Sequence, residues 1–147
     1  MTALVLGGAA SGKSGWAEDL ICSLPRTGPL IYLATMEPWG GEAAERIGRH
    51  RALRAGKNFS CTVERPRDLA GWAPPAGSAV LLEDLGNLAA NELFSGENLD
   101  PEGAYRRIRR GLDVLREGAG HLVVVSGDLF RAVSYTHLRA HETSAHL

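Results

Sequence analysis

Short, nearly continuous apolar runs alternate along the chain with longer segments that mix apolar and charged residues. Runs of Val, Ile and Leu with few polar residues are typical of parallel strands covered on both faces. The pattern predicts four such strands, at residues 3–7, 29–35, 79–84 and 121–127. Residues 59–64 alternate apolar and polar side chains more strictly and predict a fifth, shorter strand.

The segments between these runs predict helices at residues 12–24, 41–56 and 101–118. The third has the clearest ends, with Asp100 as N-cap, Pro101 in the first turn and Gly118 just past the end. The apolar positions of this helix recur every three or four residues and form one stripe. They are Ala104, Ile108, Leu112 and Leu115.

Alternation of strands and helices predicts an α/β fold, an open and mainly parallel sheet with flanking helices. We assign residues 1–131 to one such domain and residues 132–147 to a separate tail, because the periodic pattern stops there. The tail is read as a disordered segment, as a metal-binding tract containing His137, His141 and His146, or as a non-native stretch such as translated sequencing-adapter read-through. We favour the last interpretation and leave the tail out of the functional argument.

Composition narrows the class of protein. The chain has 147 residues and a formal net charge of −1, so no overall basic field attracts nucleic acid. Its apolar runs are too short to span a bilayer, and its start does not have the pattern of a signal peptide. Cys22 and Cys61 have no C-x-x-C spacing and are expected to be reduced thiols, which predicts a cytoplasmic protein.

Residues 7–14, "GGAASGKS", match the phosphate-binding motif G-x-x-x-x-G-K-[ST] at every fixed position. Small residues allow successive backbone N–H groups to surround a phosphate, and the following helix points its positive end at the same anion. Lys13 is expected to reach the β- and γ-phosphates, and the hydroxyl of Ser14 to bind Mg²⁺. The preceding strand and following helix are the context that this motif requires, so the sequence predicts a P-loop that binds a nucleoside triphosphate.

An acidic pair follows the strand at residues 79–84. Glu83 and Asp84 are expected at the carboxyl edge of the sheet, where the ligands of such folds bind. Either carboxylate is a candidate second ligand for Mg²⁺. The alternative is an acidic strand-to-loop junction without a metal.

The predicted helix at residues 41–56 carries Arg46, His50 and Arg54 at spacings of four residues, with Arg51 beside them. Residues at this spacing share one helical face. Arginines bind phosphate, and their charge favours a neutral, nucleophilic imidazole at His50. From spacing alone, a solvated basic face with an inactive histidine is the more frequent case.

Four collinear segments resemble a known family, the bifunctional adenosylcobinamide kinase / adenosylcobinamide-phosphate guanylyltransferases of cobalamin biosynthesis. The segments are "GGAASGKS", "IYLATMEPWGGEAAERIGRHRALR", "TVERPRDL" and "VLLEDLGNLAANELF". The second is the most specific, because an A-T-M-E-P run followed by R-I-x-x-H-x-x-x-R is not a general feature of P-loop proteins. The resemblance covers about residues 2–131 and implies a P-loop NTPase-like fold.

The resemblance implies two reactions. ATP or GTP first phosphorylates adenosylcobinamide, and GMP then passes from GTP through a guanylylated His50 to give adenosylcobinamide-GDP. It also implies Mg²⁺ as cofactor and a homo-oligomeric protein without a membrane span. Lys13 and His50 are the implied catalytic residues, and Ser14 and Glu83 the metal-binding ones. The implied nucleotide contacts are Gly7, Gly8, Ala9, Ala10, Ser11, Gly12, Lys13, Ser14, Ala34, Thr35, Met36, Arg51, Ala52, Leu53, Arg54, Glu64 and Glu83.

The sequence departs from the family pattern in two places. The family has an Asn-Glu pair after the strand at 121–127, where this chain has Gly127 and Asp128. Family members also continue through further elements, so we expect this chain to be truncated, with an exposed sheet edge. Two alternative functions therefore stay open: a generic P-loop small-molecule kinase in which His50 is structural, and a nucleotide-binding domain without turnover.

Overall fold

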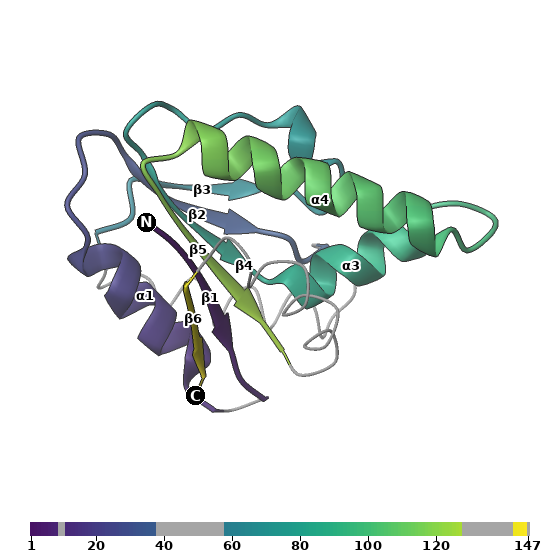
Figure 1. Cartoon of the computed structure of the whole chain (residues 1–147), viewed down its shortest axis with the longest axis horizontal. Helices are drawn as coiled ribbons and strands as arrows, with labels where there is room; N and C mark the ends of the chain where they lie inside the picture. Colours follow the sequence, from purple (N-terminus) through teal and green to yellow (C-terminus); the bar gives the residue numbers. More distant parts are fainter. Residues whose placement is uncertain (9–10, 38–57, 128–142, 147) are drawn as a thin grey trace.

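A computed structural model describes residues 1–8, 11–37, 58–127 and 143–146. Within these residues, six strands form one sheet in which every neighbouring pair is parallel. The order across the sheet is β3-β2-β4-β5-β1-β6 (Figure 1). The strands are β1 (Thr2–Leu6), β2 (Leu30–Ala34), β3 (Cys61–Glu64), β4 (Ala79–Glu83), β5 (His121–Ser126) and β6 (Thr143–His146).

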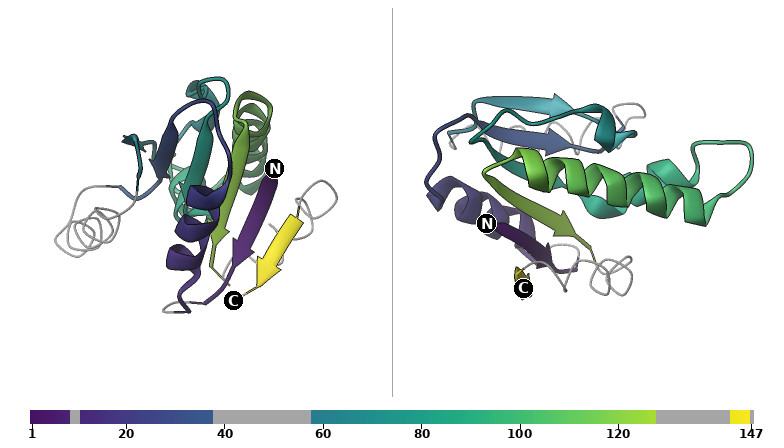
Figure 2. Two further views of the ribbon diagram at one scale, coloured as in Figure 1. Left: turned by 90° about the vertical axis from the view of Figure 1, so that its left-hand side faces the viewer. Right: turned by 45° about the horizontal axis from the view of Figure 1, so that its top comes forward.

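Helices cover both faces of the sheet. They are α1 (Lys13–Ser23), α3 (Leu85–Leu93) and α4 (Pro101–Gly118), with a short 3₁₀ helix η1 (Leu69–Gly71). Figures 1 and 2 show α1 on one side of the sheet and α3 and α4 on the other. None of the helices in the described part of the chain is long and apolar enough to cross a membrane.

Alternate residues of each strand face opposite layers, so the sheet separates two hydrophobic cores. On β1, Leu4 and Leu6 belong to the core under α3, α4 and η1, whereas Ala3 and Val5 belong to the core under α1. The other central strands repeat this division, which explains why their sequences are nearly continuous apolar runs. The α/β architecture predicted from the sequence is confirmed.

The ends of α4 show how local sequence sets an element. Asp100 accepts a hydrogen bond from the backbone N–H of Gly103 at 3.0 Å, and Pro101 begins the helix, as predicted. Leu115 is fully buried, and Ala104 and Leu112 are nearly so. Gly118 was expected just past the helix but is its last residue, and the C-cap is Ala119.

One α-helix, the short 3₁₀ helix η1 and one strand were not predicted. Helix α3 directly follows β4, and strand β6 pairs with β1 along one edge of the sheet (Figure 2). β6 lies inside the 132–147 segment that we set apart as a tail, and whether this segment is native stays a prediction. Because β6 pairs with it, β1 is not an edge strand in the described part of the sheet.

The predicted helix at 41–56 lies outside the described residues, as do Ala9 and Ala10 of the loop, Asp128, and the tail histidines His137 and His141.

Candidate nucleotide-binding site

The carboxyl ends of five strands meet at one edge of the sheet. Pairing places Glu64 beside Ala34, Ala34 beside Glu83, Glu83 beside Val125 and Val125 beside Val5. Three of the predicted site residues are therefore in one row across β3, β2 and β4. The loop after β1 leaves the sheet at the same edge, two strands away from Glu83. In a parallel sheet this is the edge at which ligands bind.

The glycines of the loop after β1 are needed for its shape. Gly12 has φ 83° and ψ 9°, a left-handed conformation that favours glycine, and it caps the start of α1. A Cβ atom at Gly7 would lie 2.5 Å from Oγ of Ser11 and 3.3 Å from Cβ of Lys13. These two positions are fixed glycines of the phosphate-binding motif, and the loop geometry supplies a physical reason for each.

Lys13 is the first residue of α1 and turns its side chain back over the loop. Its Nζ donates a hydrogen bond to the carbonyl O of Gly8 at 3.2 Å. The ammonium group therefore lies above the loop at the positive end of a helix, a setting that attracts phosphate.

Ser14 and Glu83 are 69 positions apart in the sequence and contact each other in the structure. The hydroxyl of Ser14 donates a hydrogen bond to Oε1 of Glu83, and Glu83 is 8% exposed. A hydroxyl and a carboxylate side by side are hard oxygen ligands suited to Mg²⁺. The two residues predicted to bind the metal are thus brought together.

Among the described residues, no group of three or more His, Cys, Asp or Glu side chains gathers as a metal site. A magnesium ion that is held by one or two protein oxygens and by the phosphates of its nucleotide needs no such group. The pair of Ser14 and Glu83 fits this second kind of site.

Asp84 has a different place from Glu83. Its carboxylate accepts a hydrogen bond from the backbone N–H of Asn87 at 2.6 Å and so caps the start of α3. The sequence left either carboxylate as the metal ligand, and the geometry favours Glu83.

Thr35 connects β2 to this acidic pair. Its side chain is fully buried and hydrogen-bonds with both the N–H and the carbonyl O of Asp84, at 2.9 and 2.7 Å. Its own N–H donates to the carbonyl O of Glu83 at 3.1 Å. Thr35 was predicted as a nucleotide contact, and in the structure its hydroxyl fixes the backbone that carries Glu83.

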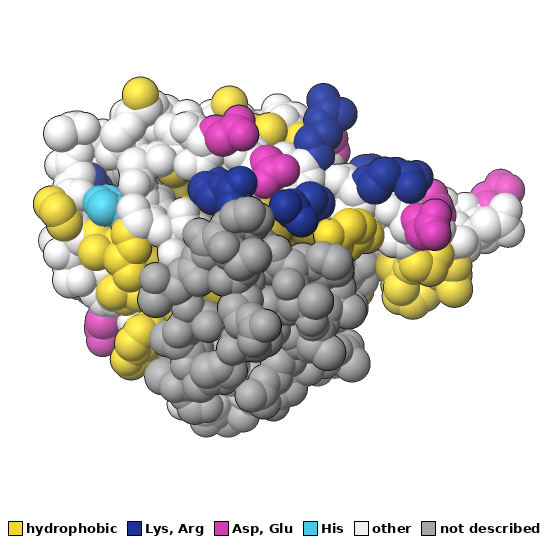
Figure 3. Space-filling model, in the orientation of Figure 1, with side chains coloured by type: hydrophobic (Ala, Val, Ile, Leu, Met, Phe, Trp, Pro, Cys, Tyr) yellow, Lys and Arg dark blue, Asp and Glu magenta, His cyan; other side chains and the backbone are white. Residues whose placement is uncertain are grey.

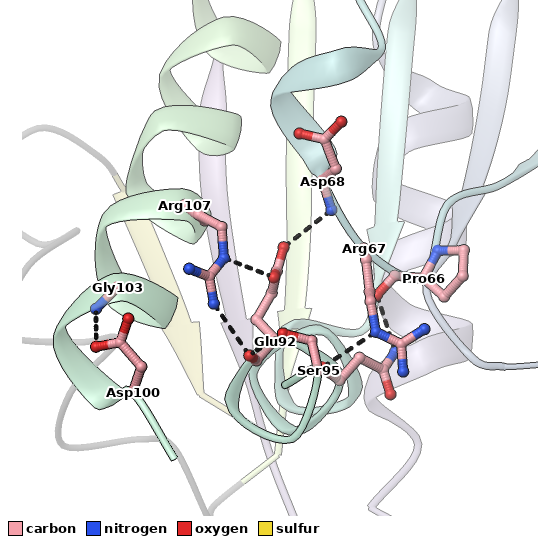
Figure 4. Close-up of polar contacts among 9 residues, drawn as sticks. Pro66, Arg67, Asp68, Glu92, Ser95, Asp100, Gly103 and Arg107 are labelled. Carbon is pink, nitrogen blue, oxygen red and sulfur yellow. Dashed lines mark hydrogen bonds and ion pairs between the residues drawn. The ribbon is translucent and has the colours of Figure 1, made fainter. Parts of the chain in front are cut away.

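The last turn of α3 ties together the segments that leave β2 and β3, and Figure 4 shows the contacts of Glu92 with the segment after β3 and with α4. The side-chain amide of Asn91 donates to the carbonyl O of Thr35 at 2.8 Å and of Pro66 at 3.0 Å. The buried carboxylate of Glu92 accepts from the backbone N–H of Asp68 and from Nε of Arg107, each at 2.9 Å. Both strand exits are thereby held against α3, and Glu92 also joins the exit of β3 to α4.

Arg67 and Glu37 add a contact between these two exits. Arg67 donates from Nε to the carbonyl O of Asn91 at 3.3 Å and forms an ion pair with Glu37. Met36 precedes Glu37 and is partly buried, whereas Glu64 at the end of β3 is exposed. The predicted contacts at Ala34, Met36 and Glu64 therefore lie on two strand ends that the structure fixes relative to each other.

Sequence reasoning missed Tyr32, Asn91 and Glu92 as parts of this region. Each carries a polar group that is paired across a long sequence separation. The available signal was that all three lie in or beside the segments that carry the family resemblance.

Charged side chains of both signs intermix on the face shown in Figure 3. Among the described residues, several arginines pair with acids, as in the contacts of Arg107 with Glu92 and of Arg116 with Asp113.

Several predicted residues lie outside the described part of the chain. They are Ala9, Ala10, Arg46, His50, Arg51, Ala52, Leu53, Arg54 and Asp128. Their roles stay predictions.

The parallel sheet, the glycine loop and the Ser14–Glu83 pair are those of the P-loop class of α/β proteins. Within that class, residues 3–142 match one family, described as cobinamide kinase / cobinamide phosphate guanyltransferase. Because the match covers most of the chain, this chain belongs to that family. The resemblance inferred from the sequence is confirmed.

Curated relatives agree with this assignment. The bifunctional adenosylcobalamin biosynthesis protein CobU of Salmonella typhimurium is 36% identical over 118 residues, which are 77% of this chain and 62% of that protein. The bifunctional adenosylcobalamin biosynthesis protein CobP of Pseudomonas aeruginosa is 33% identical over 131 residues, or 87% of this chain and 72% of that protein. The matched region thus spans less than two thirds of the Salmonella protein.

Proposed function

We propose that this chain carries out two successive reactions in the assembly of cobalamin. It phosphorylates adenosylcobinamide with ATP or GTP, and it then transfers GMP from GTP to the product, giving adenosylcobinamide-GDP. The observation that carries the proposal is the contact between Ser14 and Glu83 beside a phosphate-binding loop, in a chain of this family. It supports the binding of a magnesium–nucleotide complex at the strand ends.

In the first reaction, the P-loop holds the triphosphate and Lys13 stabilises charge on the transferred group. The hydroxyl oxygen of adenosylcobinamide attacks the γ-phosphorus, and the bond from this phosphorus to the β–γ bridging oxygen breaks. Bound Mg²⁺ would neutralise charge on the phosphates, with Ser14 and Glu83 as its protein ligands.

In the second reaction, we assign the nucleophile to His50. A ring nitrogen of His50 attacks the α-phosphorus of GTP, a P–N bond forms and pyrophosphate leaves. A phosphate oxygen of adenosylcobinamide phosphate then attacks the same phosphorus, so the P–N bond breaks and the histidine is regenerated. The covalent intermediate divides a transfer between two large anions into two displacements.

The direct test is a product assay. The protein is incubated with adenosylcobinamide, ATP, GTP and Mg²⁺. The corrinoids are then separated by chromatography and identified by mass spectrometry. The proposal expects adenosylcobinamide phosphate first and adenosylcobinamide-GDP later. Adenosylcobinamide phosphate without adenosylcobinamide-GDP would instead identify a small-molecule kinase. Nucleotide binding without either corrinoid product would identify a domain without turnover.

A further inference from the structure

Tyr32 is a buried phenol at the centre of the nucleotide-binding edge, and the function proposed above leaves it without a role. It lies on β2, pairs in register with Leu81 of β4 and is 2% exposed. Glu83 is two residues beyond Leu81, so its side chain is on the same face as Tyr32 and within diagonal reach. The hydroxyl of Tyr32 donates a hydrogen bond to Oε2 of Glu83 at 2.7 Å.

The two oxygens of Glu83 therefore have different partners. Oε2 is held by Tyr32 from β2, and Oε1 accepts from Ser14 at the start of α1. A glutamate side chain has several rotatable bonds, and a single partner would leave its carboxylate free to turn. A second donor on the opposite oxygen fixes both its direction and its plane.

We propose that Tyr32 is a positioning residue for the magnesium–nucleotide complex. Its hydroxyl holds the carboxylate of Glu83 so that Oε1 faces Ser14 and the cation that accompanies the nucleotide. The inference rests on the proposed function, because it takes Ser14 and Glu83 as the protein ligands of the metal.

Hydrogen bonds to a metal-binding carboxylate hold it in the orientation that the metal needs. A hydrogen bond from a neutral donor to a carboxylate is stronger than one between neutral groups, and burial strengthens it further. Partners that orient a metal ligand typically change metal affinity by about 10- to 100-fold when they are removed. The hydroxyl of Tyr32 is placed to have this effect without touching the metal.

Packing is the competing explanation for Tyr32. Its ring meets the ring of Phe59 edge to face, with centroids 5.5 Å apart, and it belongs to the core under α1. Tyr32→Phe separates the two explanations, because it keeps the ring and its packing and removes only the hydroxyl. Phe59→Leu is the matched control, since it changes the ring contact and keeps the hydroxyl bond.

The test measures binding of Mn²⁺, a spectroscopic substitute for Mg²⁺, by electron paramagnetic resonance. The protein is saturated with a GTP analogue whose α–β bridge is methylene, so that no guanylylation occurs. We expect Tyr32→Phe to raise the Mn²⁺ dissociation constant about 10- to 100-fold. Affinity for the analogue in EDTA should stay within about twofold of the wild type, because the loop glycines and Lys13 are intact. Phe59→Leu should bind Mn²⁺ like the wild type.

Glu83→Gln is the reference variant, because it replaces the proposed ligand itself. If Glu83→Gln weakens Mn²⁺ binding and Tyr32→Phe does not, the inference is wrong and the proposed metal site stands. If Glu83→Gln has no effect, both the metal site and the inference are wrong. An equal loss in Phe59→Leu would assign the effect to packing and overturn the inference.

Discussion

Lys13 turns its ammonium group back onto the loop, where it bonds to the carbonyl O of Gly8 at 3.2 Å. A nucleotide phosphate would offer the same group a full negative charge in place of a carbonyl. The residue is therefore placed to exchange a weak internal partner for the triphosphate of its substrate.

Replacing Lys13 by Ala should abolish both proposed activities, because both reactions need the triphosphate held in one loop. Removing one such electrostatic group lowers kcat by about two to three orders of magnitude. The measurement is the rate of each product under saturating nucleotide. Arg106→Ala, which also removes one positive charge but from an exposed position on α4, should leave both rates within about twofold of the wild type. Guanylylation that survives in Lys13→Ala would show that the two reactions use separate nucleotide sites.

Among individual residues, the sequence predicted those that belong to a local motif. Gly7, Gly12, Lys13 and Ser14 were found by their spacing, because a phosphate loop is a local structure. The partners of Glu83 were not all found: Tyr32 comes from a neighbouring strand, 51 positions away, and nothing local in the sequence marks that contact.

Among the helices, α3 is one that the pattern of apolar residues did not predict. This helix has only nine residues and includes Gly86 and Asn87, which have low helix propensity. The sequence still contained a signal, since Asp84 stands as N-cap before the apolar residues Leu85 and Leu88. By contrast, α4 has 18 residues, a proline start and a regular apolar stripe, and its extent was predicted to within one residue.

Glu92 connects three elements, so its carboxylate should contribute strongly to stability. In Glu92→Gln, the amide NH₂ group must face either Nε of Arg107 or the N–H of Asp68, and both are donors. We expect a loss of about 1–3 kcal/mol in the free energy of unfolding, the range for leaving a buried donor without its acceptor. Urea unfolding monitored by circular dichroism measures it.

Glu102→Gln is the matched control for this change. Glu102 also pairs with an arginine, Arg106, but its side chain is 90% exposed and the two atoms are 4.0 Å apart. Its loss should stay below about 1 kcal/mol, because exposed pairs and helix-dipole terms are small. Equal losses in the two variants would contradict the role that we give to Glu92.

Gly111 allows α4 to approach η1. A Cβ atom at this position would lie 2.5 Å from Cβ of Leu69, which is fully buried. In Gly111→Ala, overpacking of about 1–3 kcal/mol opposes a gain in helix propensity of about 1 kcal/mol. We expect a net loss of stability of up to about 2 kcal/mol, because the clash is with Cβ of Leu69, which moves only with its backbone.

Gly15→Ala is the comparison, since a Cβ atom at Gly15 of α1 meets nothing within 4 Å. It should raise the free energy of unfolding by about 0.5–1 kcal/mol through helix propensity alone. Thermal and urea unfolding of both variants check the pair. The account of the α4–η1 contact fails if Gly111→Ala is as stable as Gly15→Ala.

The strand order of the whole molecule brings the phosphate-binding loop close to Glu83. β5 lies between β1 and β4, so the loop after β1 and the acidic end of β4 are two strands apart, and α1 and the side chain of Glu83 close the remaining distance. Alternating apolar runs predicted the class of sheet, but the order of its strands depends on long-range pairing that periodicity does not encode. The strand order therefore came only from the structure.

At the same scale, β2 and β3 end at the same edge of the sheet as β1 and β4, and α3 holds both of their exits. Residues 38–57, which carry His50 and its neighbouring arginines, follow directly after the β2 exit in the sequence. The segment of the proposed nucleophile thus follows, in the sequence, a strand that ends at the same edge of the sheet as the contact between Ser14 and Glu83.

The central claim is that GMP becomes bonded to His50, and labelling with α-³²P GTP tests it most directly. The account predicts protein-bound label that is acid-labile, as a P–N bond is. The label should be lost in His50→Ala. It should be kept in His121→Ala, because His121 begins β5, at the end of the strand away from the nucleotide-binding edge. Adding adenosylcobinamide phosphate should remove the label from the protein and transfer it to adenosylcobinamide-GDP, because pyrophosphate has already left in the first step. A protein that stays unlabelled while it phosphorylates adenosylcobinamide, or a His50→Ala variant that is labelled like the wild type, would contradict it.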